Sequence, residues 1–170
     1  MRIIAGKYKR RNIKTLESYD TRPTKDMVKE AIFDSIQINE GDTFLDLFAG
    51  SGAIGIEAIS RGANKVVFND NNIKAVYIIK ENLKSINETA EVYNEDSLIL
   101  LKDLKESFSY IFIDPPYIYD KYDDLIDLIK HNNLLKDNGS IILEVNKDTV
   151  IKHKVFKEKK YGISKILYIK

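Results

Sequence analysis

The sequence predicts an α/β fold whose sheet is mostly parallel and has one antiparallel edge. Segments typical of strands alternate with segments of helical periodicity through the middle of the chain, which indicates successive βαβ units. Four strand segments are apolar without interruption, as strands buried on both faces of a parallel sheet should be: residues 44–45, 66–68, 111–113 and 141–143. The last two strand candidates have no helix between them, which favours a terminal hairpin and therefore an antiparallel edge.

The expected elements follow from the spacing of apolar and turn-forming residues. Residues 1–15 are predicted to form a short extended arm or hairpin, followed by a loop over 16–23. A helix is expected over about 25–36, where Met27, Val28 and Ile32 stand at helical spacing behind Thr24, a candidate N-cap. Further helices are expected over residues 53–60, 73–86, 97–104 and about 122–129. Strands are expected over residues 43–48, 65–69, 91–93, 110–113, 140–145 (entered by a turn at 138–139), 150–156 and 163–169.

The composition is that of a soluble globular domain. The 170 residues are 44% hydrophobic and 31% charged, which suffices for one domain with a buried core. The chain has no cysteine and only two histidines, which excludes disulfides and thiolate catalysis and argues against a metal site. No apolar run is long enough for a membrane span, and the apolar part of the N-terminus is too short for a signal peptide. We therefore expect a cytoplasmic protein that binds no metal.

The two ends of the chain are basic and the middle is acidic. Residues 1–30 hold nine Lys and Arg against four Asp and Glu, residues 145–170 hold eight against two, and the middle holds ten against twenty. This distribution suggests that the ends face a polyanion, although lysine-rich ends can also be plain solvated surface. Tyr8 stands among the N-terminal cations as a candidate stacking residue. The candidate phosphate-contacting residues are Arg2, Lys7, Lys9, Arg10, Arg11 and Arg22.

A glycine motif follows the first expected strand of the sheet. Gly50, Gly52 and Gly55 form a G-x-G-x-x-G pattern, and Asp70 lies 20 residues beyond Gly50, at the end of the next strand. The pattern alone fits either a dinucleotide or an adenosyl cofactor, and Asp70 suits ribose hydroxyls in both. Asp46 separates the two, because an acid before the glycine turn would repel a pyrophosphate. It would favour the ammonium and sulfonium groups of S-adenosylmethionine.

Asp96 follows the third strand and has two interpretations. Its side chain could accept a hydrogen bond from the adenine amino group, or Asp96 or Ser97 could cap the next helix, and both could hold at once. The candidate cofactor-binding residues are Asp46, Phe48, Ala49, Gly50, Ser51, Gly52, Asp70, Asn71, Asp96 and Ser97.

The motif that indicates a reaction is Asp114-Pro115-Pro116-Tyr117, at the end of the fourth strand. The lone pair of an exocyclic base amine is delocalised into the ring, so the nitrogen is a poor nucleophile. Two acceptors, the Asp114 carboxylate and a proline carbonyl, can draw the nitrogen toward sp³ geometry and direct its lone pair at a methyl group. Tyr117 offers a face on which an extruded or single-stranded base can stack. We therefore predict methylation of an exocyclic amine on a nucleic-acid base.

Four segments together resemble the RsmD family of bacterial 16S rRNA guanine-N2 methyltransferases. They are RIIAGKY (2–8), TRPT (21–24), FLDLFAGSG (44–52) and FIDPPY (112–117), in the family's order and spacing. The resemblance implies a class I methyltransferase fold, a Rossmann-like three-layer sandwich with a seven-stranded sheet and an antiparallel last strand. It implies a basic N-terminal arm or hairpin over 1–23 and an S-adenosylmethionine-dependent methyltransferase domain over 24–170.

The resemblance also implies a substrate and a set of roles. The target is the N2 amine of one guanine in 16S rRNA, in an assembled or partly assembled small subunit, and the product of the cofactor is S-adenosylhomocysteine. The matching catalytic turn is Asp114, Pro115, Pro116 and Tyr117, with Asp46, Gly50 and Gly52 in the cofactor loop. We expect a monomer that binds no membrane.

Three other functions stay open from the sequence. An adenine-N6 methyltransferase acting on DNA or RNA uses the same kind of turn, although the chain has no room for a separate DNA-reading domain. An NAD-dependent oxidoreductase would explain the glycine motif, but no histidine or Tyr-x-x-x-Lys pair follows the strands. A non-catalytic RNA-binding module would need neither Asp114 nor the glycine turn.

Overall fold

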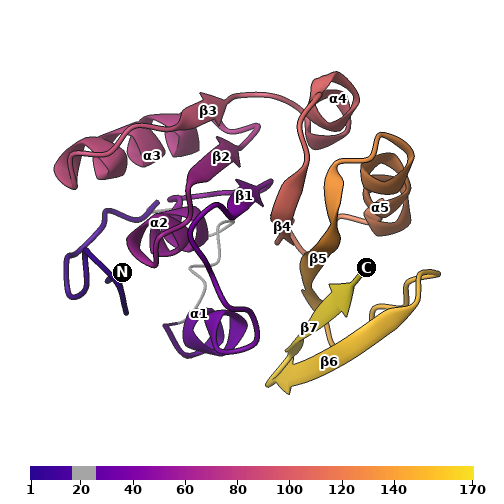
Figure 1. Ribbon diagram of the computed structural model, residues 1–170. Coiled ribbons are helices and arrows are strands. Elements are labelled where there is room, and N and C mark those ends of the chain that lie inside the picture. Colours follow the sequence, from indigo (N-terminus) through magenta and orange to yellow (C-terminus); the bar gives the residue numbers. More distant parts are fainter. Residues whose placement is uncertain (17–25) are drawn as a thin grey trace.

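The computed structural model describes residues 1–16 and 26–170. Five helices and seven strands lie in these residues, in the alternating order expected from the sequence (Figure 1). The helices are α1 (Asp26–Phe33), α2 (Ala53–Ser60), α3 (Ile73–Ser85), α4 (Ser97–Asp103) and α5 (Tyr122–His131). The strands are β1 (Thr43–Asp46), β2 (Lys65–Asn69), β3 (Glu91–Tyr93), β4 (Phe108–Ile113), β5 (Leu135–Asn146), β6 (Val155–Tyr161) and β7 (Ser164–Ile169).

The seven strands form one sheet in the order β3-β2-β1-β4-β5-β7-β6. β1 to β5 are parallel, whereas β7 runs antiparallel to both β5 and β6. This confirms the mostly parallel sheet with an antiparallel edge. The edge arises because β6 and β7 are joined by a tight turn, and such a turn can only connect antiparallel neighbours.

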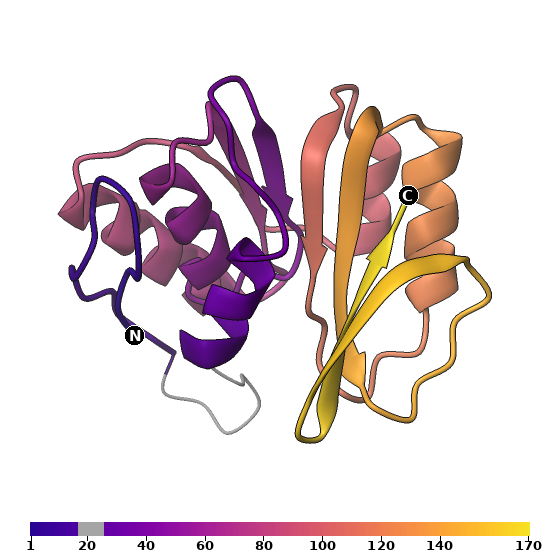
Figure 2. The ribbon, with the colours of Figure 1, turned by 60° about the horizontal axis from the view of Figure 1, so that its bottom comes forward.

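Helices cover both faces of the sheet, which makes three layers (Figures 1 and 2). α1, α2 and α3 pack on one face, against strand residues such as Phe44 and Phe112. α4 and α5 pack on the other face, against the alternate residues Leu45 and Ile111. Side chains of a strand point to opposite faces in turn, so an apolar strand with no polar interruption supplies both cores.

Three elements have a boundary that differs from expectation by three residues or more. α1 ends at Phe33 rather than near Ile36. β5 begins at Leu135, so the expected turn at 138–139 lies inside the strand. There it forms an irregularity, because the six residues 135–140 of β5 lie opposite only the three residues 108–110 of β4. The strand expected over 150–156 is wrong: Val150 is 88% exposed and β6 begins at Val155. β6 carries lysines along an edge of the sheet, where charged residues discourage pairing with other chains. These lysines interrupt the apolar pattern by which a strand is predicted from the sequence.

The N-terminal segment is a hairpin docked on α2 and α3. Arg2 pairs with Asn12 across it, and the buried side chains of Ile3, Tyr8 and Ile13 face the core. Gly6 approaches α2 so closely that a Cβ atom there would lie 1.8 Å from the Ser60 carbonyl oxygen. Only glycine fits this contact, and its φ of +81° is also one that other residues avoid.

Glu57 of α2 is the main anchor of this hairpin. Its buried carboxylate accepts hydrogen bonds from the backbone N–H groups of Ile4 (2.8 Å) and Ala5 (2.9 Å). It also pairs with Arg61 at 2.9 Å and with the fully buried Lys29 of α1 at 3.5 Å. The hairpin, α1 and α2 are therefore tied together at one buried carboxylate. Thr24, the expected N-cap of α1, lies outside the described residues.

Candidate active site

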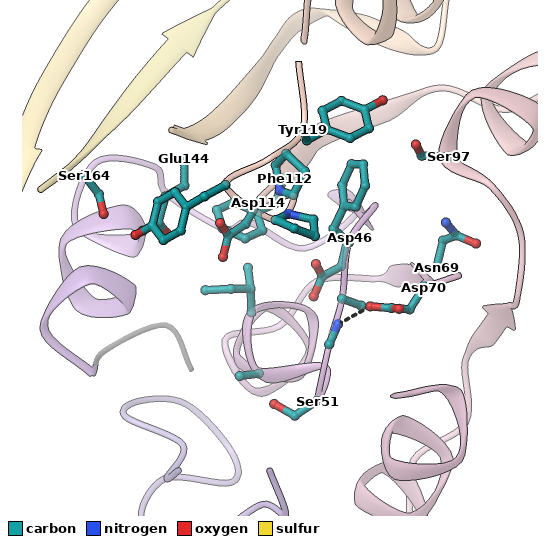
Figure 3. Close-up of a pocket in the computed structure, with 18 of the residues that line it drawn as sticks. Asp46, Ser51, Asn69, Asp70, Ser97, Phe112, Asp114, Tyr119, Glu144 and Ser164 are labelled. Carbon is teal, nitrogen blue, oxygen red and sulfur yellow. Dashed lines mark hydrogen bonds between the residues drawn. The ribbon is translucent and has the colours of Figure 1, made fainter. Parts of the chain in front are cut away.

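A large pocket opens at the carboxyl ends of the parallel strands, with a volume of about 1550 Å³ (Figure 3). The turns after β1, β2, β3 and β4 line one part of it, and β5 with the β6–β7 turn lines another. All the predicted catalytic residues and all the predicted cofactor-binding residues except Gly52 line this pocket. Residues far apart in the sequence lie together here because the carboxyl ends of parallel strands are all on the same side of the sheet.

The glycine turn after β1 has the backbone shape that only glycine adopts without strain. Gly50 and Gly52 have φ angles of +54° and +78°. Space is open above Gly50: among the described residues other than its two chain neighbours, no atom lies within 4 Å of where its Cβ would be. Gly52 instead sits beneath the turn at the N-cap of α2, packed near Phe68 and Ile79. Gly52 therefore shapes the turn and does not line the pocket.

Asp46 is a buried acid at the centre of this site. Its Oδ2 atom accepts a hydrogen bond from the Gly55 N–H at 2.9 Å. Its Oδ1 atom is buried and has no hydrogen-bond partner among the residues that the structure describes. Burial raises the pKa of Asp46 to about 7, the Gly55 N–H opposes this and the charge of Asp70 adds to it. This carboxyl is therefore suited to a positively charged ligand group, which would stabilise its ionised form.

Asp70 links the turns that follow β1 and β2. Its Oδ2 atom accepts from the Gly50 N–H at 2.8 Å and its Oδ1 atom from the Asn72 N–H at 2.8 Å. Burial raises the pKa of Asp70, and the two N–H groups oppose that rise. Each oxygen can accept a second bond from a ligand hydroxyl, since a carboxylate has about four lone-pair sites.

Asn69 is a positioning residue that the sequence analysis missed. Its amide group donates to the carbonyls of Leu47 (3.2 Å) and Glu95 (3.1 Å), and its Oδ1 accepts from the Glu95 N–H (3.1 Å). The buried side chain thus ties the turns after β1 and β3 to β2. The sequence does contain a signal for this role. Asn69 ends an apolar strand, and a side-chain amide buried there needs hydrogen-bond partners.

Asp96 is the N-cap of α4. Its Oδ1 atom accepts from the backbone N–H groups of Leu98 (2.9 Å) and Ile99 (3.3 Å). This confirms the capping interpretation for Asp96, whereas the alternative cap, Ser97, is wrong. Asp96 is also exposed and lines the pocket, so its expected contact with adenine stays a prediction.

The Asp-Pro-Pro-Tyr turn leaves the end of β4 and forms the pocket floor beside Asp46 (Figure 3). Asp114 is half-buried and Pro115 is buried, whereas the Tyr117 side chain is 47% exposed. The Pro116 carbonyl accepts from the Tyr119 N–H at 2.8 Å, which closes the turn. The Tyr119 ring packs edge-on against Phe48 at 5.4 Å between centroids. The turn is therefore anchored through Tyr119, while the Tyr117 side chain lines the pocket and stays half-exposed.

The far wall of the pocket was not anticipated from the sequence. It is formed by Glu144 of β5, by the β6–β7 turn and by Met27 of α1. Met27 was expected on the buried face of its helix, but it is 68% exposed, and Lys29 takes a buried place instead. The signal for Glu144 was present as one acid inside the apolar run of residues 141–145.

The predicted phosphate-contacting residues that the structure describes do not line the pocket. Arg2, Lys7, Lys9, Arg10 and Arg11 are exposed on the docked hairpin, and Arg22 lies outside the described residues. The expectation that Tyr8 stacks on a base is wrong. Tyr8 is buried, its hydroxyl is hydrogen-bonded to Glu88, and the Lys7 amine lies 4.9 Å from its ring centroid. The hairpin needs an apolar anchor to dock, and Tyr8 supplies it.

Two kinds of feature are absent from the part of the chain that the structure describes. No group of three or more His, Cys, Asp or Glu residues there has the arrangement of a metal site. No helix within residues 1–16 and 26–170 has the length and apolar character needed to cross a membrane.

A family model matches the whole chain, and relatives match most of it. The family model described as conserved hypothetical protein 95 matches residues 1–170. Ribosomal RNA small subunit methyltransferase D of Haemophilus influenzae is 38% identical over 174 residues, covering 96% of this chain and 90% of that protein. The Escherichia coli K12 protein of the same name is 31% identical over 146 residues, covering 85% and 74%.

Solved structures agree with these sequence matches. The structure of a hypothetical protein of Thermus thermophilus superposes with a TM-score of 0.87 at 27% identity, covering 99% of this chain and 98% of that one. The family model and the relatives at 30% identity or more span most or all of the sequence. The chain therefore belongs to the family of conserved hypothetical protein 95, the RsmD family that its motifs resemble.

Proposed function

We propose that this protein transfers the methyl group of S-adenosylmethionine to the exocyclic N2 amine of a guanine in 16S rRNA. The observation that carries the proposal is the juxtaposition of the Asp114-Pro115-Pro116-Tyr117 turn with the glycine turn and Asp46 in one pocket. A relative at 38% identity that is named ribosomal RNA small subunit methyltransferase D supports the substrate.

The residues around the glycine turn fit S-adenosylmethionine. The buried Asp46 Oδ1 has no partner within residues 1–16 and 26–170, and open space lies above Gly50. A cationic ligand stabilises such a carboxylate, and an amino-acid moiety needs such space. Asp70 would hold the ribose hydroxyls and Asp96 the adenine amine. The other predicted cofactor-binding residues that line this half of the pocket are Phe48, Ala49, Ser51, Asn71 and Ser97.

When bound, the cofactor supplies an electrophilic methyl group on a sulfonium. Asp114 would accept one N2–H of the guanine. Because the Pro116 carbonyl already accepts from Tyr119, we assign the second N2–H to the Pro115 carbonyl. The two acceptors hold the nitrogen with its lone pair toward the methyl group, and positioning of this kind supplies most of the rate. Once methylated, the amine would carry one proton too many, and the Asp114 carboxylate beside it would accept that proton.

The base must leave its helix to reach this pocket, or be unpaired already. The half-exposed ring of Tyr117 would stack on it at the pocket mouth. Residues 1–23 would form one basic unit that contacts rRNA phosphates, beside a methyltransferase domain over residues 24–170. The contacting side chains would be Arg22 and the exposed Arg2, Lys7, Lys9, Arg10 and Arg11.

The remaining parts of the proposal concern the context of the reaction. The substrate would be an assembled or partly assembled small ribosomal subunit in the cytoplasm, and the protein would act as a monomer without a metal. The reaction itself needs no Lewis acid, because the sulfonium already activates the methyl group.

The test is transfer of labelled methyl from S-adenosylmethionine to small ribosomal subunits from cells that lack this gene. Digestion to nucleosides should yield labelled N2-methylguanosine. Label in N6-methyladenosine, or in DNA instead of rRNA, would replace the proposal with the adenine-N6 function. Cofactor binding with no transfer to subunits, free rRNA or DNA would favour a non-catalytic RNA-binding module.

A further inference from the structure

Glu144 lies beside Asp114 on the neighbouring strand. β4 and β5 are parallel, and their last paired residues are Ile113 and Leu143. The next residue on each chain is Asp114 and Glu144. Neighbouring strands are about 4.8 Å apart, so the two acids leave the sheet side by side.

The two acids also project from the same face of the sheet. Phe112 and Ile142 pack in the core under α1, α2 and α3, whereas Ile113 and Leu143 pack in the opposite core. Side chains alternate along a strand, so Asp114 and Glu144 return to the face of Phe112 and Ile142. Both line the pocket, and in Figure 3 Glu144 lies on the far side of Asp114 from Asp70.

Glu144 is an acid within an apolar stretch of β5. Its neighbours Leu143 and Val145 are 0% and 3% exposed, and the segment is otherwise apolar. A carboxylate there must be half withdrawn from water, which is unfavourable unless it gains strong polar contacts. Glu144 lines the part of the pocket beyond Asp114, on the side away from the glycine turn, where a hydrogen-bond donor of a ligand would meet its carboxylate.

We propose that the Glu144 carboxylate accepts the N1–H of the target guanine and thereby selects guanine over adenine. This rests on the proposed function, in which Asp114 accepts from N2. On the Watson–Crick edge of guanine the neighbour of the N2 amine is N1–H, a donor. In adenine the neighbour of the N6 amine is N1, an acceptor, which a carboxylate would repel. Flipped bases are read on this edge by such matched contacts.

The test compares guanine with 2,6-diaminopurine at the methylated position of 16S rRNA reconstituted into small subunits. Diaminopurine keeps the N2 amine but its N1 is an acceptor. The wild-type protein should prefer guanine by about 10- to 100-fold in kcat/KM, the value of one hydrogen bond to a charged group. Because diaminopurine also differs at position 6, 2-aminopurine is tested in parallel. It has only hydrogen at position 6, so discrimination against it by a similar factor excludes a clash of the 6-amino group as the cause of the preference.

The Glu144→Gln variant should reverse part of this preference. Its amide can donate to N1 of diaminopurine, so the guanine to diaminopurine ratio should fall to within a few-fold of one. Asp148→Asn is the matched control. It also removes one carboxylate, but Asp148 is exposed, follows the end of β5 and does not line the pocket, so the wild-type ratio should be kept. Cofactor affinity should be unchanged in both variants, which establishes that they fold.

Two outcomes would overturn the inference while leaving the proposed function intact. One is equal wild-type rates on guanine and diaminopurine, which needs no variant to fold. The other is a Glu144→Gln variant that binds cofactor and keeps the wild-type ratio. Absence of N2-methylguanosine with the wild-type protein would instead reject the proposed function, and this inference with it.

Discussion

At the scale of single residues, acids with different surroundings share the pocket. Asp46 is buried with one oxygen unpartnered among the described residues, Asp70 is satisfied by two backbone N–H groups, and Asp96 caps a helix. Their environments differ, so their pH behaviour should differ too. The sequence indicated all three as candidate cofactor ligands. It could not reveal which was buried, because burial depends on residues distant in the chain.

Asp46 should make cofactor affinity depend on pH. Its pKa of about 7 without ligand means that below pH 7 the carboxyl is mostly protonated and cannot pair with a cation. Binding therefore releases a proton, and affinity should fall as pH drops from 8 to 6, by up to about tenfold. Calorimetric titration in buffers of different ionisation enthalpy measures both the Kd and the released proton. Asp46→Asn is the control and should lack the proton release, whereas equal pH profiles for the two proteins would contradict this role.

At the scale of elements, the sequence predicted best what depends on local signals. α2, β2 and β3 have the expected bounds, because glycine turns and apolar runs mark their ends. The start of β6 was missed, because alternating lysines resemble a solvated loop. The docking of the N-terminal hairpin was also missed, since it depends on Glu57, Ser60 and Asn82, whose partners lie more than 50 residues away.

Glu57 should dominate the stability of the hairpin, α1 and α2. Glu57→Ala removes the buried partner of Lys29 and the acceptor of two backbone N–H groups. Breaking a buried pair in this way costs about 3–5 kcal/mol in the free energy of unfolding. Glu81→Ala is the control, because its ion pair with Lys14 is exposed and should contribute less than about 1 kcal/mol. Urea denaturation measures both, and equal losses would show that Glu57 is no anchor.

At the scale of the whole molecule, the pocket and the cations of the hairpin occupy different places, although Met1, Thr15 and Leu16 at the ends of the hairpin line the pocket. The pocket lies at the carboxyl edge of the sheet, while the cations of the hairpin lie over α2 and α3 and do not line it. A large RNA could touch both at once. The Asp-Pro-Pro-Tyr turn and the glycine turn were predictable because each motif is contiguous in sequence. The place of Glu144 in the pocket was not predictable, since only the pairing of β4 with β5 brings Glu144 beside Asp114.

The hairpin should contribute to RNA affinity through phosphate contacts. Replacing Arg10 and Arg11, both exposed, with Gln should weaken binding to small subunits and flatten its salt dependence. The log–log slope should decrease by up to about 0.7–0.9 for each lost phosphate contact. Filter binding across a salt series measures the slope. The charge-matched control replaces two exposed lysines outside the hairpin, Lys102 and Lys105, with Gln. A slope unchanged from wild type would mean that this surface does not contact phosphate.

The most direct test of the central claim is a paired measurement on Asp114→Ala: methyl transfer to small subunits and the Kd for S-adenosylmethionine. If Asp114 holds the base amine, transfer should fall by at least about 10²–10³-fold, as when one acceptor or donor of a transition state is removed. The cofactor Kd should stay within a few-fold of wild type, because the cofactor residues lie on other turns of the pocket. Transfer that survives the substitution, or cofactor binding that collapses together with activity, would contradict the assignment of Asp114 to the target base.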